Sequence, residues 1–315
     1  MTEASQPEAP QPEAIARARA TARAERDFTT ADALRDELAA AGWTVIDEPG
    51  GGWRLEPLAH PSADEAEPLQ PHDVVSRLDE PATDDMSVHW LCEGWPDDVA
   101  RAIASFRSHQ ADRSVRYVVS DLTGAAHDAF GDDVEVVSLV EGTGWGAAAN
   151  AALRRATGRI VLFMDPSIEV AGDVFGPLER ALADREVGIA GPFGIVTHDL
   201  REFDQAPGAG PCDAIEGYCM AMRRDVLASV QGFDEKFRWY RTADIELSFR
   251  VKDGGLRTEV VPLPVVKHEH RMWFETPPAE RARWSKRNFY RFLDRWRDRW
   301  DLVLDPRPPP KGEPR

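Results

Sequence analysis

Acidic residues, glycines and a histidine follow one another in the second half of the chain in an order that can support chemistry on a phosphorylated ligand. Asp165 comes directly after the apolar run 160–164, which is short, β-branched and aromatic and therefore predicts a buried strand. A carboxylate at the carboxyl end of such a strand lies at the edge of an open α/β sheet, where ligands bind. Further along come, in order, Gly217, the segment 232–235, Asp244 and His268. The set suggests a sugar-like, phosphorylated ligand.

Composition limits the classes of protein to consider. The 315 residues are enough for one large domain, or for one domain with attachments. The formal net charge of −17 argues against nucleic-acid or anionic-membrane binding by the whole surface. Three cysteines (Cys92, Cys212 and Cys219) are too few and too scattered for a disulfide framework or a zinc cluster. No stretch is long enough to span a membrane, and the acidic, Pro-rich amino terminus is unlike a signal peptide. We expect a cytoplasmic protein, or one peripheral to the inner face of the membrane.

The first part of the chain predicts a small module of its own. Residues 1–12 are rich in Pro, Glu and Gln and predict a disordered tail. Two helices are expected within residues 13–41. A glycine turn between the short apolar segments 43–46 and 53–55 then predicts a β-hairpin. Together they form a small helical module over residues 13–57.

The amino-acid sequence of this module resembles that of a known family. The matching residues are Ala22-Arg23, Asp27-Phe28, Ala31-Asp32, Leu34-Arg35-Asp36-Glu37-Leu38, Gly42 and Trp53-Arg54. Residues 13–56 are similar to the carboxyl-terminal end of cysteinyl-tRNA synthetase, which implies an RNA contact. The nucleotide-binding and zinc-binding signatures of the synthetase are absent, so synthetase activity is not implied. The alternative, which we favour, is a reused scaffold that serves for packing.

An acidic, Pro-rich linker is predicted over residues 58–85, and after it the residue pattern changes to one of regular secondary structure. Strands that alternate with helices then predict an α/β fold with parallel pairing in a doubly wound sheet. The expected strands are 87–91, 115–119, 134–140, 159–164, 187–190, 214–222 and 259–266, and the first helices begin at Pro96 and Gly146. A basic, aromatic helix follows over 277–300, and residues 301–315 are expected to be a disordered tail.

Residues 86–276 resemble the family 2 glycosyltransferases, which belong to the GT-A group of nucleotide-sugar enzymes. The motifs that carry the resemblance are Asp121, the glycine-spaced segment Gly146, Asn150 and Gly158, then Asp165-Pro166-Ser167, Glu216-Gly217-Tyr218-Cys219-Met220, Gly232-Phe233-Asp234-Glu235, Tyr240, Asp244, Arg250 and His268. The resemblance implies a GT-A, Rossmann-like mixed sheet with flanking helices, preceded here by the small helical and β-hairpin module.

Roles for individual residues follow from the resemblance. It implies that Asp121, Asn150 and Asp165 bind the donor and that Glu216 and Gly217 lie on the acceptor side. The base would be Asp244, and the metal ligands would be Asp165 and His268. The chemistry suits these residue types. A divalent cation such as Mg²⁺ or Mn²⁺ takes oxygen ligands and neutralises a diphosphate leaving group. An acceptor hydroxyl must lose its proton to a positioned base.

Each of these residues also has a purely structural interpretation. Asp165 can cap a loop, Asp121 can be a turn aspartate, and Asp244 can be an acid favoured by the helix dipole. His268 and His270 can be exposed loop histidines. Asp234 is expected to be a structural turn residue.

Three positions depart from the family pattern. The segment Cys92-Glu93-Gly94-Trp95 replaces the usual loop after the first strand, which puts nucleobase contacts there in doubt. Ser167 replaces the second acid of the metal signature, so a cation would be held weakly. Ala243 replaces the acid that commonly precedes the base. The alternative of a family relative that binds the donor but does not catalyse transfer therefore remains.

The helix 277–300 allows two interpretations. Trp284, Phe292 and Trp296 lie near one face of it, among several arginines. The helix can touch anionic lipid, or it can dock these rings on the catalytic domain with the arginines in solvent. Docking is favoured because Asp294 and Asp298 interrupt the positive charge.

The sequence thus predicts a metal-assisted, inverting glycosyltransferase that takes a nucleotide-sugar donor. Its acceptor stays unknown, and a lipid-linked acceptor and a polysaccharide are the candidates. Two alternatives remain: a glycosyltransferase-like binding protein without activity, and an RNA-associated adaptor that acts through residues 13–56. Sequence leaves the sugar, the acceptor and the oligomeric state open.

Overall fold

The structure is a computed structural model and describes residues 12–25, 27–40, 43–47, 52–57, 67–126 and 129–307. The chain divides into two compact units, Met1–Ala66 and Glu67–Arg315. Most of the predicted tails, 1–11 and 308–315, lie outside the described residues. Residues 301–307 are described, and Leu302 and Val303 are buried in a cluster with the last long helix. The start of the predicted carboxyl-terminal tail therefore packs as part of the fold.

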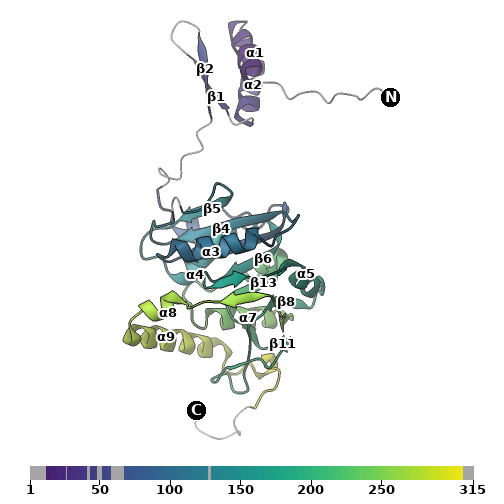
Figure 1. Cartoon of the computed structure of the whole chain (residues 1–315), viewed down its shortest axis with the longest axis vertical. Helices are drawn as coiled ribbons and strands as arrows, with labels where there is room; N and C mark the ends of the chain where they lie inside the picture. Colours follow the sequence, from purple (N-terminus) through teal and green to yellow (C-terminus); the bar gives the residue numbers. More distant parts are fainter. Residues whose placement is uncertain are drawn as a thin grey trace, which may run out of the picture. The chain divides into compact units, whose positions relative to one another are not determined.

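The first unit is the expected helical hairpin with a β-hairpin (Figure 1). It contains α1 (Pro12–Ala24), α2 (Phe28–Ala40), β1 (Trp43–Asp47) and β2 (Trp53–Pro57), with the two strands antiparallel. Ile15, Ala16 and Leu38 form its buried core, and the strand tryptophans pack against them. The two elements share one apolar cluster because neither hairpin buries its own face alone.

The second unit is built on an eight-stranded mixed sheet in the order β11-β14-β8-β13-β6-β3-β4-β5. The strands are β3 (Asp84–Cys92), β4 (Val115–Asp121), β5 (Val134–Ser138), β6 (Gly158–Met164), β8 (Val187–Gly191), β11 (Gly210–Cys212), β13 (Cys219–Arg223) and β14 (Arg257–Val260). β6, β3, β4 and β5 are parallel, whereas β13 runs antiparallel between β6 and β8. The predicted α/β mixed sheet is confirmed.

Helices cover both faces of this sheet. α3 (Pro96–Arg107) and α5 (Phe175–Ala183) pack on one face. α4 (Trp145–Arg154), α6 (Arg224–Val230) and α7 (Ala243–Asp253) pack on the other. Within β3, Met86, Val88 and Trp90 face the first set, and Leu91 faces the second. Successive side chains of a strand alternate between the faces, so a strand covered on both sides is apolar throughout.

Two predicted strands are each divided in two. The prediction 214–222 becomes β12 (Ala214–Ile215) and β13, with a turn at 216–218 between them. The prediction 259–266 becomes β14 and β15 (Val265–Lys267). Pro262 and Pro264 lie between these two and cannot donate a backbone hydrogen bond to a ladder, so the strand is interrupted there. β15 pairs instead with β7 (Ile168–Val170), directly after Asp165-Pro166-Ser167.

The segment 67–83, which the sequence assigns to the linker, packs on the sheet. Leu69 forms a bridge to Leu139, and its backbone bonds with Ser138 and Val140. Val74, just after the 3₁₀ helix Pro71–Asp73, is buried in the core. The acidic side chains of this segment face outward, and of its apolar ones Val74 is buried and Leu78 packs against the core, whereas Leu69 and Val75 are exposed. A count of charges alone does not reveal the two residues that pack inward.

The last helices are α8 (Arg271–Glu275) and α9 (Pro278–Trp296). Phe292 and Trp296 of α9 are buried, with ring centroids 5.1 Å and 5.9 Å from the ring of Phe249 in α7. Trp284 stays half-exposed between the guanidinium groups of Arg283 and Arg287. The helix is therefore docked through two of its three predicted rings. No helix within the described ranges is long and apolar enough to cross a membrane.

Candidate active site

Asp165 lies at the carboxyl end of a central strand of the large sheet. It follows β6 directly, and its backbone N–H donates to the carbonyl of Tyr218, 3.0 Å away. The backbone N–H of Ser167 donates to Oδ1 of Asp165 over 2.8 Å, and the Ser167 hydroxyl donates to the same oxygen. Ser167, which replaces the second acid of the metal signature, thus orients the first acid.

The second oxygen of Asp165 faces a histidine. Nε2 of His270 lies 3.0 Å from Oδ2 of Asp165. The imidazole is held edge-on by the rings of Tyr218 and Tyr240, at centroid distances of 5.5 Å and 4.5 Å. Burial by itself raises the pKa of Asp165, but the hydrogen bond and charge of His270, with the bonds from Ser167, outweigh it and lower that pKa. Asp165 is therefore a pre-formed anion.

His268, the predicted metal ligand, is placed differently. Its backbone N–H donates to the carbonyl of Ser167 over 2.7 Å, and its Nε2 lies 2.7 Å from Oε2 of Glu169. The structure therefore brings His270, and not His268, to Asp165. Both histidines follow the short strand β15, and only the second of them reaches Asp165.

Asp244 and the acceptor-side segment do come together. Asp244 is in the first turn of α7, and the backbone N–H of Gly217 donates to its Oδ2 over 2.9 Å. Burial raises the pKa of Asp244, while hydrogen bonds from Gly217 and Ile245 act in the opposite direction. Burial, and then the charge of Asp244, also raise the pKa of Glu216. Two carboxyl groups with raised pKa values thus lie near one another, a pattern common at functional sites.

Asp165 lines two cavities. The larger has a volume of about 890 Å³ and is also lined by Glu216, Gly217 and Asp244. The smaller has a volume of about 20 Å³ and lies toward β3, where Glu93 and His270 line it. The larger cavity falls in the range of sites for small molecules, whereas the smaller holds little more than a water or an ion.

Glu93 is a site residue that the sequence does not assign. It follows β3, and burial together with the charge of Asp165 raises its pKa to about 8. Its position in the unusual segment Cys92-Glu93-Gly94-Trp95 is the signal that could have identified it. The sequence reveals a departure from the family there but not its proximity to Asp165.

Asp121 lies at the carboxyl end of β4, two strands from β6 in the sheet. It is fully buried, and its carboxylate accepts hydrogen bonds from the backbone N–H groups of Thr123 (3.0 Å) and Ala126 (2.9 Å). It holds the loop after β4 in place. Its predicted contact with the donor stays a prediction.

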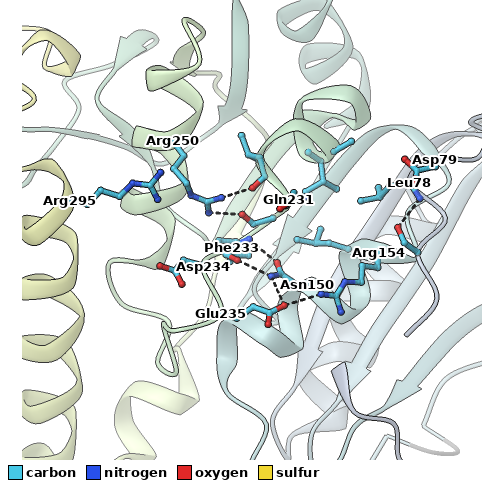
Figure 2. Close-up of a pocket in the computed structure, with 16 residues that line it drawn as sticks. Leu78, Asp79, Asn150, Arg154, Gln231, Phe233, Asp234, Glu235, Arg250 and Arg295 are labelled. Carbon is cyan, nitrogen blue, oxygen red and sulfur yellow. Dashed lines mark hydrogen bonds and ion pairs between the residues drawn. The ribbon is translucent and has the colours of Figure 1, made fainter. Parts of the chain in front are cut away.

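Asn150 lines a separate cavity of about 550 Å³, shown in Figure 2. Its side chain donates to the carbonyl of Phe233 over 2.8 Å and accepts from the Phe233 N–H over 2.7 Å. A Cβ on Gly232, whose φ is +73°, would lie 2.2 Å from Oδ1 of Asn150. Asn150 therefore fixes the segment 232–235 to α4, and its predicted role in donor binding stays a prediction.

The residues beside Asp165 can be compared with the needs of a divalent cation. Among the described residues, no three His, Cys, Asp or Glu side chains are arranged to hold a metal ion. Asp165 and His270 offer two ligand atoms 3.0 Å apart, which matches two adjacent ligands of an octahedral ion at about 2.1 Å each. Ions such as Mg²⁺ commonly take one or two protein ligands and complete their shell with substrate phosphates and water. The site fits a cation that enters with a diphosphate.

Comparison with known families supports both resemblances. Residues 8–53 match the cysteinyl-tRNA ligase anticodon binding domain, and residues 112–246 match glycosyl transferase family 2. The second match includes Asp121, Asp165 and Asp244 but ends before β15, α8 and α9. The two resemblances stated from the sequence are confirmed, over these ranges.

A solved structure supports the fold, and a second solved structure is similar to the chain. A crystal structure of GalNAc-T7 with UDP, GalNAc and Mn²⁺ has a TM-score of 0.56 and 16% sequence identity, covering 69% of this chain and 49% of that one. This chain thus spans about half the length of that protein. The mannosyltransferase PcManGT from Pyrobaculum calidifontis, in complex with GDP-Man and Mn²⁺, has a TM-score of 0.48 and 20% identity, covering 70% of this chain and 67% of that one. The fold of the second unit is that of the GT-A glycosyltransferases.

Proposed function

We propose that the protein is a glycosyltransferase that moves a sugar from a nucleotide-diphosphate donor to an acceptor hydroxyl. The observation that carries the proposal is that Asp165, at the carboxyl end of β6, and Asp244 line one cavity of about 890 Å³. Asp165 suits the diphosphate side of the sugar, and Asp244 suits the acceptor side. The match of residues 112–246 to glycosyl transferase family 2 supports the same activity.

Asp244 is the proposed base. The hydrogen bond from Gly217 fixes the direction of its carboxylate, and burial makes it a stronger base than a solvated aspartate. It would accept the proton of the acceptor hydroxyl as the new glycosidic bond forms on the face of the sugar away from the diphosphate. That geometry would invert the configuration at the transferred carbon.

Asp165 and His270 are the residues that would hold a divalent cation. Such a cation, when bound, would neutralise charge on the diphosphate leaving group. Lys267, the last residue of β15, adds a positive charge near Asp165, because the two side chains interact electrostatically. Partial burial lowers the pKa of Lys267, and the charges of Glu216 and Asp165 act against that effect.

Release of nucleotide tests this proposal. Wild-type protein is incubated with UDP-, GDP- and dTDP-sugars, with Mn²⁺ or with chelator, and the nucleotide released by transfer or by slow donor hydrolysis is measured. We expect at least one donor to be cleaved faster with Mn²⁺. If a donor binds but none is cleaved under any condition, the protein is a donor-binding relative without turnover, and Ser167 and Ala243 are the first residues to examine.

A second candidate function concerns the first unit. Residues 8–53 match an anticodon binding domain, which supports an RNA contact through this module. Electrophoretic mobility of transfer RNA with the full chain and with residues 67–315 tests it. If the full chain shifts the RNA band and residues 67–315 do not, the RNA contact is supported. If the two proteins shift the band equally, the proposed contact through this module is wrong.

The three cysteines agree with a cytoplasmic location, which we also propose. Cys92, Cys212 and Cys219 are all buried and free. Free thiols persist where the compartment is reducing.

A further inference from the structure

Several cations line the larger cavity. Four basic side chains face it, and within the described residues none of them forms an ion pair with a carboxylate: Arg201, Arg241, Lys267 and Lys286. Acidic residues outnumber basic ones by 55 to 38, so carboxylate partners are plentiful. Elsewhere exposed arginines use them: Arg257 bonds with Asp184, Glu186 and Glu259. Cations without carboxylate partners at one cavity are therefore available to an anionic ligand.

Two of the four lie over aromatic rings. The ammonium group of Lys267 lies 3.3 Å from the centroid of the Tyr218 ring, and the guanidinium carbon of Arg241 lies 5.1 Å from the ring centroid of Trp273. Burial and the charge of Asp244 raise the pKa of Glu216, and the charges of Lys267 and Arg241 act against them. These two cations thus already act on a residue of the predicted acceptor side.

Arg201 and Lys286 are different because, within the described residues, neither side chain lies over an aromatic ring; all four cations are exposed. Arg201 comes from the loop between β9 (Gly194–Val196) and β10 (Asp204–Gln205), and Lys286 comes from α9. Neither has a side-chain partner among the described residues. An exposed, unpaired cation is free to meet an incoming anion.

The helix that carries Lys286 is fixed relative to the proposed base. Asn288, buried in α9, donates to the carbonyls of Trp239 (2.7 Å) and Arg241 (2.8 Å), just before the helix that bears Asp244. α9 also contributes Phe289 and Tyr290 to the cavity wall. Aromatic walls with a few placed polar groups are typical of sites for small molecules. α9 therefore forms a fixed wall of the acceptor side.

We propose that the acceptor carries an anionic group, a phosphate or a carboxylate, which Arg201 and Lys286 bind while the acceptor hydroxyl reaches Asp244. This inference rests on the proposed glycosyltransferase function and names the class of its acceptor. A guanidinium binds phosphate or carboxylate through two parallel hydrogen bonds, and an ammonium adds a point charge. Both cations lie in a cavity that also holds the proposed base, so one acceptor can contact all three.

Binding of simple probes to the full chain tests this inference. The probes are glucose, glucose 6-phosphate, glucuronate and dodecyl phosphate, titrated by calorimetry or followed by saturation-transfer NMR without donor or metal. We expect the anionic probes to bind wild type at least about tenfold more tightly than glucose, the effect of one charge-assisted contact. In the double variant Arg201→Ala/Lys286→Ala the preference should fall to about twofold or less.

Matched variants separate this site from general charge effects. Arg159→Ala/Arg185→Ala removes two exposed arginines from outside the cavity lining and should keep the preference. Lys267→Ala removes a cation of the donor side and should also keep it. Tighter binding of dodecyl phosphate than of glucose 6-phosphate would identify a lipid phosphate, and the reverse order a soluble or polymeric acceptor.

Three results would overturn the inference: equal binding of glucose and the anionic probes, no binding of the anionic probes at millimolar concentration, or an unchanged preference in Arg201→Ala/Lys286→Ala. Because no donor is present, these results leave the proposed function intact. Conversely, a protein that binds the anionic probes but releases no nucleotide from any donor keeps an anion site and loses the proposed reaction.

Discussion

The backbone N–H of Gly217 donates a hydrogen bond to Oδ2 of Asp244 over 2.9 Å. Gly217 lies in the turn between β12 and β13, and Asp244 lies in the first turn of α7. The bond joins the segment predicted to face the acceptor with the predicted base. Oδ1 of Asp244 accepts a hydrogen bond from the backbone N–H of its neighbour Ile245, and Asp244 lines the larger cavity.

Replacing Asp244 with asparagine should separate chemistry from binding. Asp244→Asn keeps the shape and can still accept the Gly217 bond, but it cannot take a proton. We expect turnover to fall by about 10²–10⁴-fold with donor affinity nearly unchanged. Steady-state rates and donor titrations check this. Asp253→Asn, at the other end of α7, is the matched control and should behave as wild type. Equal turnover in Asp244→Asn and wild type would mean that the base is another residue.

The pH dependence of turnover should reflect the same group. Burial raises the pKa of Asp244, so its protonated, inactive form appears at a higher pH than the ordinary aspartate value of about 3.9. The acid limb of the rate profile should therefore have its midpoint above that value. The native protein binds this proton more tightly than the unfolded chain does, so protonation of Asp244 favours the folded state as pH falls. An acid limb at or below the ordinary value would contradict the assignment.

Thiol reactivity should be very low in the native protein. Cys92 is fully buried and burial raises its pKa to about 11, and burial raises the pKa of Cys219 to about 12 and that of Cys212 as well. The reactive species is the thiolate, so both access and ionisation oppose reaction. A thiol reagent should react with three groups per chain in denaturant and with almost none before unfolding. Rapid native reaction of even one thiol would show that its surroundings are open.

Two truncations should differ in stability. A chain that begins at residue 67 keeps Leu69 and Val74 in place and should melt cooperatively. A chain that begins at residue 81 loses the buried Val74 and the backbone bonds of Leu69. Its free energy of unfolding should be lower by roughly 2–4 kcal/mol. Urea unfolding of both chains measures this. Equal stabilities would show that residues 67–80 contribute nothing, and a residue-67 chain without a transition would show that the first unit is required.

Sequence predicts the centre of this fold better than its margins. The run 160–164 is apolar because β6 is covered on both faces, and that is a local signal. Sequence does not predict the interruptions of the strands at 216–218 and 261–264. Both predicted strands are apolar on average, and that average conceals a turn in the first and two prolines in the second. The packing of residues 67–83 was missed because one buried Val74 among many acids is a weak pattern.

The candidate site was predicted in part, for a related reason. Asp165, Gly217 and Asp244 have recognisable local sequences, and the structure brings all three to one cavity. The approach of His270 to Asp165 depends on the register of β15 against β7 and on the turn that follows, which no short motif encodes. The wall contributed by α9 likewise depends on the docking of Phe292 and Trp296.

The most direct test of the account is Mn²⁺-dependent binding of a nucleotide sugar to wild type and to Asp165→Asn. Titration with the best donor of the panel, with Mn²⁺ and with chelator, gives four dissociation constants. We expect Mn²⁺ to tighten donor binding to wild type by at least about tenfold, and Asp165→Asn to remove most of that gain while the chelator values stay equal. Equal affinities of wild type and Asp165→Asn under both conditions would contradict the role of Asp165 in holding the donor.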